Sequence, residues 1–364
     1  MASESGRVAV IGGGVIGLSI AWRLAADGRR VTVYDAAPEA REASWAAAGM
    51  LAPHHEADSA DDLWRLGVAS LASWPAFSAA LGGSAATDHH QHGGLVPLVE
   101  AGDHAAIASR QAMLLSQGID AQWLDQPAVR ALEPALSSVG GALLVPGGQV
   151  DPRRVVAALR QACAAAGVEL RYHVAVSAVE PGLVADGAGT ARFDEVILAS
   201  GAWTPDLARL AGVELVGEPV KGQLIRFQVP DGLLTRFVHS HHAYLVPRRG
   251  QGVVVGSTMV SAGFDRSEDP AAIARLAAGA RALVPALAEA GIAESWTGLR
   301  PRLQGGKPLI GRLAAGLLLA TGHFRNGVLL APITAEIITA AVAGREAPAA
   351  GVPFAPGTVT TRTR

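Results

Sequence analysis

The sequence predicts an α/β protein with two domains: a parallel sheet flanked by helices, and a second, α+β domain built on an antiparallel sheet. A length of 364 residues is enough for two domains of ordinary size and a large core. The first third of the chain opens on a strand–helix–strand pattern, which is typical of parallel sheets. From Lys221 onward, apolar and polar residues alternate instead, as in antiparallel strands with one face buried.

Residues 7–35 contain the most informative pattern, which reads as strand, tight turn, helix and second strand. In the turn, Gly12 reverses the chain, Gly14 lets the backbone approach a pyrophosphate, and Gly17 lets helix and strand pack closely. The helix N-terminus offers free N–H groups to phosphates. Asp35, at the end of the second strand, is placed to accept hydrogen bonds from ribose hydroxyls. The segment predicts a Rossmann-type domain that binds a dinucleotide.

The remaining elements are expected from apolar spacing and from turn residues. Expected strands cover 8–11, 31–34, 168–172, 174–179, 193–199, 223–229, 242–248, 252–259 and 295–303, and expected helices cover 18–26, 61–81, 103–117, 152–166, 270–290 and 334–343. Asp151 is a good N-cap, and Gly167 ends the helix that follows it. His242, Tyr244 and Val246 are expected to share one face of a strand. The chain beyond Pro348 is expected to be poorly ordered.

Because α/β patterning returns in the middle of the chain, the first domain is expected to be discontinuous. Its predicted segments are 1–80, 145–218 and 304–364, and the second domain takes 81–144 and 219–303.

Composition excludes several classes of protein. Half of the residues are apolar and the net charge is −2, so nothing favours nucleic acid or an anionic membrane as a partner. A single cysteine, Cys163, rules out an internal disulfide and indicates a reducing compartment. The first strand begins too early for a signal peptide, and the glycine turn argues against a membrane span over 8–26. We expect a cytoplasmic protein.

Three short segments carry candidate binding residues. Small residues over 46–49 would let the backbone lie flat against a planar ring, and Ser44 is expected either to bind a phosphate or to cap the helix that follows it. The turn over 322–327 feeds a helix and is a second candidate site for an anion or polar ring, although Arg325 in it could equally be a surface residue. The His-His-x-His run at 89–92 matches no strong metal-ligand spacing, so no metal site is expected.

Seven motifs extend over nearly the whole chain. They are Val-Ile-Gly-Gly-Gly-Val-Ile-Gly-Leu-Ser at 10–19, Ser-Trp-Ala-Ala-Ala-Gly-Met-Leu-Ala-Pro at 44–53, Gly-Gln-Val-Asp-Pro at 148–152, Ala-Ser-Gly-Ala-Trp at 199–203, Tyr-Leu-Val-Pro-Arg at 244–248, Gly-Leu-Arg-Pro at 298–301 and Gly-His-Phe-Arg-Asn-Gly at 322–327. In this order they resemble the D-amino-acid-oxidase family of FAD enzymes, and within it the glycine oxidase (ThiO-type) branch. One departure is Asp35, where such enzymes more often carry Glu.

The resemblance implies that FAD binds noncovalently and that the antiparallel sheet of the second domain covers its flavin ring. Carried over by motif, the cofactor-binding residues are Gly12, Gly14, Val15, Ile16, Gly17, Asp35, Ala36, Ala43, Ser44, Ala47, Ala48, Gly49, Met50, Val176, Ser200, Gly201, Trp203, His323, Phe324, Arg325, Asn326, Gly327, Val328 and Leu329. Related sarcosine oxidases attach flavin through a cysteine, but Cys163 does not match that position.

The resemblance also implies the substrate site. Arg300 would pair with the substrate carboxylate, helped by Tyr244 and Arg325, while Met50, His242 and Met259 would shape the pocket. Arginine suits this task because its planar fork orients a carboxylate with two hydrogen bonds. His242 is a candidate general base, although positioning or packing suits it better because the flavin carries the chemistry. Pro301 is expected to turn Arg302 away from the pocket.

The function implied is oxidative deamination of glycine and small amines such as sarcosine and D-alanine. The expected products are an imine or 2-oxo acid, ammonia and hydrogen peroxide, and the expected electron acceptor is molecular oxygen. The reaction is expected to supply thiamine thiazole synthesis. Alternatives are a D-amino-acid or sarcosine oxidase, a quinone-coupled dehydrogenase of the same fold, and a non-catalytic dinucleotide sensor. A homo-oligomer, by resemblance a tetramer, is expected.

Overall fold

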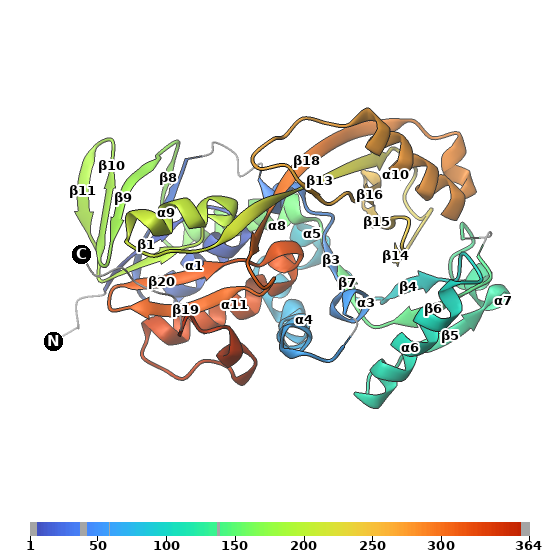
Figure 1. Ribbon diagram of the computed structural model, residues 1–364, viewed down its shortest axis with the longest axis horizontal. Helices are drawn as coiled ribbons and strands as arrows, with labels where there is room; N and C mark the ends of the chain where they lie inside the picture. The colour runs from blue at the N-terminus through green and yellow to red at the C-terminus, as the bar shows by residue number, and fades with distance from the viewer. Residues whose placement is uncertain (1–5, 37–41, 58, 137–138, 358–364) are drawn as a thin grey trace.

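The computed structural model describes residues 6–36, 42–57, 59–136 and 139–357. Two large sheets form two halves of the molecule, and the long paired strands β13 (Gly217–Phe227) and β18 (Ile292–Leu303) run from one half toward the other (Figure 1). Mixed α/β architecture with one parallel and one antiparallel sheet confirms the predicted fold class.

The parallel sheet has the strand order β19-β20-β12-β1-β2-β8. Its strands are β1 (Arg7–Ile11), β2 (Arg30–Asp35), β8 (Glu169–Tyr172), β12 (Glu195–Leu198), β20 (Leu317–Thr321) and the antiparallel edge strand β19 (Leu309–Ala314). Along β1, Val8 and Val10 belong to one apolar cluster and Ala9 and Ile11 to another. This two-residue alternation buries both faces, as parallel sheets require.

Helices cover one face of this sheet and a small sheet helps to cover the other. The first face packs on α1 (Val15–Ala26), α4 (Asp62–Ala80), α8 (Pro152–Ala165) and α11 (Gly327–Val342). The second packs on α9 (Thr204–Leu210) and on β9 (Val176–Glu180), β10 (Leu183–Asp186) and β11 (Gly189–Arg192). As predicted, Asp151 caps α8 by accepting a hydrogen bond from the backbone N–H of Arg153.

The second sheet has the order β17-β13-β16-β15-β14-β4-β6-β5, with β18 pairing β13 along its whole length. Its other strands are β4 (Gly94–Pro97), β5 (Gln122–Asp125), β6 (Gly141–Val145), β14 (Phe237–His239), β15 (Tyr244–Arg248), β16 (Gly252–Gly256) and β17 (Val260–Ser261). All its pairings are antiparallel except that between β14 and β4. Helix α10 (Pro270–Leu283) packs on it, and α6 (Asp103–Ser116) and α7 (Gln126–Leu132) lie at its far end (Figure 1).

The remaining elements are short. They are α2 (Ala43–Ala46), β3 (Met50–Leu51) paired with β7 (Gly148–Gln149), α3 (Pro53–Glu56), α5 (Ser84–Thr87) and the 3₁₀ turns η1 (Gly201–Trp203), η2 (Pro285–Ala288), η3 (Phe324–Asn326) and η4 (Ala349–Phe354).

Some predicted boundaries were wrong. Helix α11 begins at Gly327 and includes Pro332, because it is buried along almost its whole length and tertiary packing outweighs the cost of the proline. Residues 349–354 form a turn that buries Phe354, so this part of the expected disordered tail is packed, while 358–364 lie outside the described residues. Over Phe324–Val342 the chain is long and apolar enough to cross a membrane, but it packs between α1 and α4 in the core, which explains its composition.

Candidate active site

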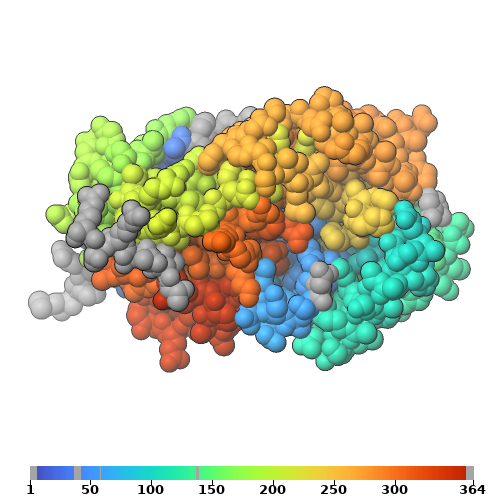
Figure 2. Space-filling view, viewed as in Figure 1, coloured from blue at the N-terminus to red at the C-terminus, as the bar shows by residue number. Residues whose placement is uncertain are grey.

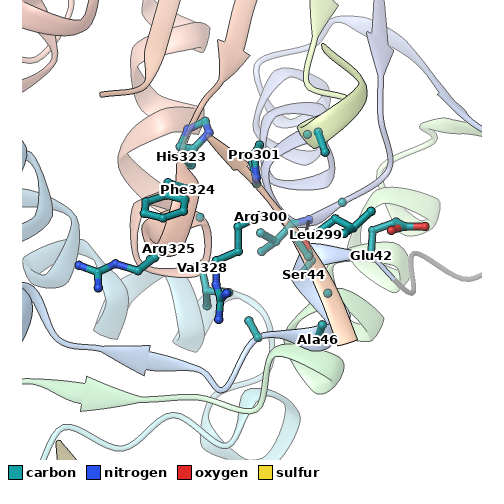
Figure 3. A pocket seen from close by; sticks show the side chains of 18 of the residues that line it. Glu42, Ser44, Ala46, Leu299, Arg300, Pro301, His323, Phe324, Arg325 and Val328 are labelled. Carbon is teal, nitrogen blue, oxygen red and sulfur yellow. Dashed lines mark hydrogen bonds between the residues drawn. The ribbon is translucent and has the colours of Figure 1, made fainter. Parts of the chain in front are cut away.

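A cavity of about 670 Å³ lies where the two sheets meet. On one side it is lined by the segments that follow β1, β2, β12 and β20, which are the carboxyl ends of the parallel strands. Open α/β sheets bind ligands at these ends. The other side is formed by β13, β18, the β14–β15 hairpin and the segment after β16. Figure 3 shows how residues of β18, α2 and the turn before α11 converge on it.

The turn after β1 forms one end of the cavity. Gly12 has a φ of +114°, and a Cβ atom there would lie 2.4 Å from the carbonyl oxygen of Ala199. Asp35 lines the cavity and accepts a hydrogen bond of 2.8 Å from the backbone N–H of Gly13, so it also holds the turn in shape. Ser44 Oγ accepts a hydrogen bond of 3.0 Å from the N–H of Val15, the first residue of α1. Ser44 therefore caps α1, which precedes it in the chain, and not the helix that follows it, and this residue also lines the cavity.

The small residues predicted to lie against a planar ring form one wall. Their backbone is held from the second sheet, because Arg248 Nη2 donates to the carbonyls of Ala47 and Ala48 at 2.7 and 3.2 Å. Trp296 Nε1 donates to the carbonyl of Ala46 at 2.9 Å. Burial lowers the pKa of Arg248 to about 10, so it stays charged at neutral pH. The wall is thus flat, free of long side chains and fixed in place.

Arg300 lies on β18, the strand whose Gly298 packs against Ala46 of this wall. Its Nη1 donates to the carbonyl of Thr258 at 3.1 Å and its Nη2 donates to Ser257 Oγ at 2.8 Å. The guanidinium lies over Gly222 of β13, where a Cβ atom would be 1.9 Å from Nη1. Only glycine leaves room for this side chain. Tyr244 lies likewise over Gly256, at which a Cβ atom would be 2.4 Å from the phenol oxygen.

A partly buried acid, Glu56, a partly buried histidine, His239, and a buried histidine, His323, complete the lining, and the sequence did not predict the first two. Glu56 of α3 lies 3.4 Å from Arg325, and burial raises the pKa of its carboxyl against the opposing effect of nearby arginines. Burial lowers the pKa of His239 to about 4 and that of His323 to about 3, so both are neutral at pH 7. No spacing signal links Glu56 or His239 to the other site residues, since each belongs to a different short element.

The structure brings nearly all of the predicted site residues together. Those that line the cavity are Gly12, Gly14, Val15, Ile16, Asp35, Ala36, Ala43, Ser44, Ala47, Ala48, Gly49, Met50, Val176, Ser200, Gly201, Trp203, His242, Tyr244, Met259, Arg300, His323, Phe324, Arg325, Asn326, Gly327 and Val328. Gly17 and Leu329 do not line it. Gly17 packs under the turn, where a Cβ atom would be 1.8 Å from the carbonyl oxygen of Gly12. The carbonyl of Leu329 accepts hydrogen bonds from Ser70 and Trp74 of α4, so this residue anchors α11.

Three expectations about the second sheet are corrected. His242 is not on a strand: it lies at the tip of the β14–β15 hairpin, on the rim of the cavity, and does not share a strand face with Tyr244. Met259 follows the end of β16 and is 57% exposed, so it also lies at the rim. Arg302 is not turned away by Pro301, because β18 stays extended and paired through it. Arg302 instead binds Glu218, and it does not line the cavity.

Cys163 is buried in α8 against α1, where its Sγ lies 3.4 Å from the carbonyl oxygen of Leu18. Burial raises the pKa of its thiol to about 12, which leaves it unreactive. It does not line the cavity.

The chain is similar to known proteins over almost its whole length. Residues 7–341 match the model of the DAO family, described as FAD dependent oxidoreductase. A glycine oxidase of Pseudomonas putida is 36% identical, over 97% of this chain and 98% of that protein. The chain is 35% identical to a bifunctional ThiO/ThiG protein of Synechocystis sp., of which it covers 51%. Its fold is similar to that of the glycine oxidase of Geobacillus kaustophilus, with a TM-score of 0.90 and 30% identity over 99% of this chain and all of that one.

Proposed function

Because the chain belongs to the DAO family of FAD-dependent oxidoreductases and is an amino-acid oxidising enzyme, we propose that it deaminates glycine and small amines such as sarcosine and D-alanine. The observation that carries this proposal is that Arg300 and the wall over 46–49 line one cavity. A carboxylate anchor facing a surface suited to a flavin ring is what oxidation at an amino-acid Cα needs.

The residues present fit FAD. Gly12 and Gly17 bring the β1–α1 turn close to the sheet, and any side chain on either would collide with backbone. The turn leads into the N-terminus of α1, whose dipole favours a pyrophosphate. Asp35 is placed for the ribose, the 46–49 wall for the ring system, and the start of α11 for the polar edge of that ring. When bound, FAD supplies the acceptor for the hydride.

The chain's own residues bind and orient the substrate. Arg300 is fixed by two hydrogen bonds, and we infer that its remaining donors take the substrate carboxylate, with the Tyr244 hydroxyl and Arg325 beside it. Glu56 neutralises part of the positive charge of Arg325. The Cα then faces the wall over 46–49, and the neutral His239 adds no charge that would oppose an amine. His242 is partly solvated at the rim and 3.2 Å from Glu100, so its role is positioning and not proton abstraction.

The overall reaction converts glycine, water and oxygen to glyoxylate, ammonia and hydrogen peroxide. We infer that molecular oxygen is the acceptor and that the imine product serves thiamine thiazole synthesis, a role supported by the similarity to ThiO/ThiG proteins.

A substrate panel tests the proposal. Purified protein is assayed for peroxide with glycine, sarcosine, D-alanine and a bulky D-amino acid, and in parallel with a quinone-type dye in the absence of oxygen. We expect peroxide with glycine and the two small amines. Turnover with the dye but no peroxide would assign a dehydrogenase, and the absence of turnover with every substrate would overturn the proposal.

A further inference from the structure

Four metal-ligating side chains gather at the rim of the cavity, on two loops far apart in sequence. We call Glu100, Asp103, His241 and His242 the rim cluster. Glu100 and Asp103 lie in the loop after β4 and at the first residue of α6, and the two histidines form the tip of the β14–β15 hairpin. In Figure 2 the gold surface around the hairpin lies against the teal surface of the α6 region.

The contacts within the rim cluster are short and specific. His241 Nδ1 lies 3.3 Å from Asp103 Oδ1, and His242 Nε2 lies 3.2 Å from Glu100 Oε1. One ligand atom each of Glu100, His241 and His242 falls within 4.8 Å of the other two. Asp103 does not belong to this group of three and lies beside His241 instead. Two ligands about 2.0–2.1 Å from one ion stand roughly 3.3 Å apart, so the separation between His242 and Glu100 suits ligands of a shared ion.

Part of the rim cluster is held in place without an ion. Asp103 Oδ2 accepts hydrogen bonds from the backbone N–H groups of Val99 and Glu100, at 3.1 and 2.9 Å, which leaves Oδ1 directed at His241. The hairpin tip is closed by the Ser240 N–H, which donates to the carbonyl of Ala243 at 3.1 Å. These bonds already fix one carboxylate and the hairpin tip. Binding of an ion therefore costs less side-chain entropy.

From this geometry we propose that the rim cluster is a binding site for a divalent transition-metal ion of the Zn²⁺ class. Two imidazoles and one carboxylate, with Asp103 holding His241 in position, suit Zn²⁺, Ni²⁺ or Co²⁺, whereas Mg²⁺ and Ca²⁺ prefer oxygen ligands throughout. The site departs from the expectation of no metal drawn from the sequence. That expectation considered the histidines at 89–92, while His241 and His242 find their carboxylates about 140 residues upstream.

An ion in the rim cluster would tie the hairpin tip, which lines the cavity, to the start of α6. The same hairpin leads into Tyr244, which lines the cavity. We expect the bound ion to slow substrate entry, so zinc raises the apparent KM for glycine. This consequence rests on the proposed function, but the existence of the site does not.

Zinc binding is measured first, without reference to activity. Tag-free flavoprotein, freed of metal by a chelator, is titrated with Zn²⁺ by calorimetry at neutral pH. We expect one ion per chain, and at least tenfold weaker binding in His241→Ala and in Asp103→Asn. His104→Ala is the matched control, because His104 is exposed and adjoins Asp103 but contacts Trp123 instead of the cluster. Thermal unfolding of each variant verifies that it is folded.

Two results would overturn the site: stoichiometry far below one ion per chain, or equal affinities for wild type and His241→Ala. Either would mean that the rim cluster holds histidine–carboxylate ion pairs and no metal. Glycine oxidation with and without Zn²⁺ is measured separately. If zinc binds with the expected stoichiometry but the protein oxidises no amine, the metal site stands and the proposed function fails.

Discussion

Replacing Arg300 by alanine tests the assignment of the substrate carboxylate anchor. Arg300 is held over Gly222 by hydrogen bonds to Thr258 and Ser257, so its guanidinium is already oriented before substrate binds. Removing one partner of a desolvated, hydrogen-bonded charge pair costs about 2–5 kcal/mol. At 1.4 kcal/mol for each factor of ten, this corresponds to about 30- to 4,000-fold in affinity. Because Arg325 lines the same cavity and compensates in part, we expect the KM for glycine to rise at least about tenfold.

The assay is steady-state glycine oxidation together with flavin content per chain. Arg302→Ala is the matched control: it removes the same side chain two residues away on β18, where it binds Glu218 outside the cavity. We expect Arg302→Ala to leave the KM close to that of wild type, and both variants to keep normal FAD content. If Arg302→Ala abolished glycine binding while Arg300→Ala did not, the anchor would be misassigned.

Three further predictions follow from single contacts. Gly222→Ala should raise the KM for glycine without loss of flavin, since its methyl group would displace the Arg300 guanidinium; steady-state kinetics with normal KM would contradict this. Acid treatment should release intact FAD from wild type and from Cys163→Ala alike, because the thiol is buried away from the cavity; flavin that stays on the denatured chain would refute it. The pKa of His323 is about 3 in the folded protein, compared with 6.5 for an ordinary histidine. The contribution of this residue to the free energy of unfolding is therefore fully present above pH 6.5 and is lost as the pH falls toward 3. That loss is about 1.4 kcal/mol per pH unit, so urea unfolding with excess FAD should show less destabilisation between pH 7 and pH 5 in His323→Gln than in wild type.

Local patterns predicted the end of the cavity formed by the β1–α1 turn well. The strand, glycine turn and helix over 7–26 lie next to one another in sequence, so their geometry depends on neighbouring residues alone. The same holds for the cap of α8 by Asp151. Ser44 was expected to cap a helix or bind phosphate, but the helix it caps begins 29 residues earlier. That choice depends on tertiary packing.

The substrate end was harder to predict because its residues meet through sheet pairing. Whether Arg302 turned away at Pro301 depended on β18 pairing with β13, which keeps the strand extended. The positions of His242 and Met259 depended on where β15 and β16 end, and element ends are the least predictable feature of a sequence. Glu56 and His239 carried no signal, since nothing in the chain around α3 or β14 indicates that their side chains reach the same cavity.

The most direct test of the account is anaerobic addition of glycine to the purified yellow protein. If Arg300 and the wall over 46–49 hold glycine against FAD, the visible absorbance of the flavin should bleach in the absence of oxygen. Readmitting air should restore it with release of one peroxide per flavin. A flavin that glycine, sarcosine and D-alanine all leave oxidised, in protein with full FAD content, would contradict the central claim that this cavity oxidises small amino acids.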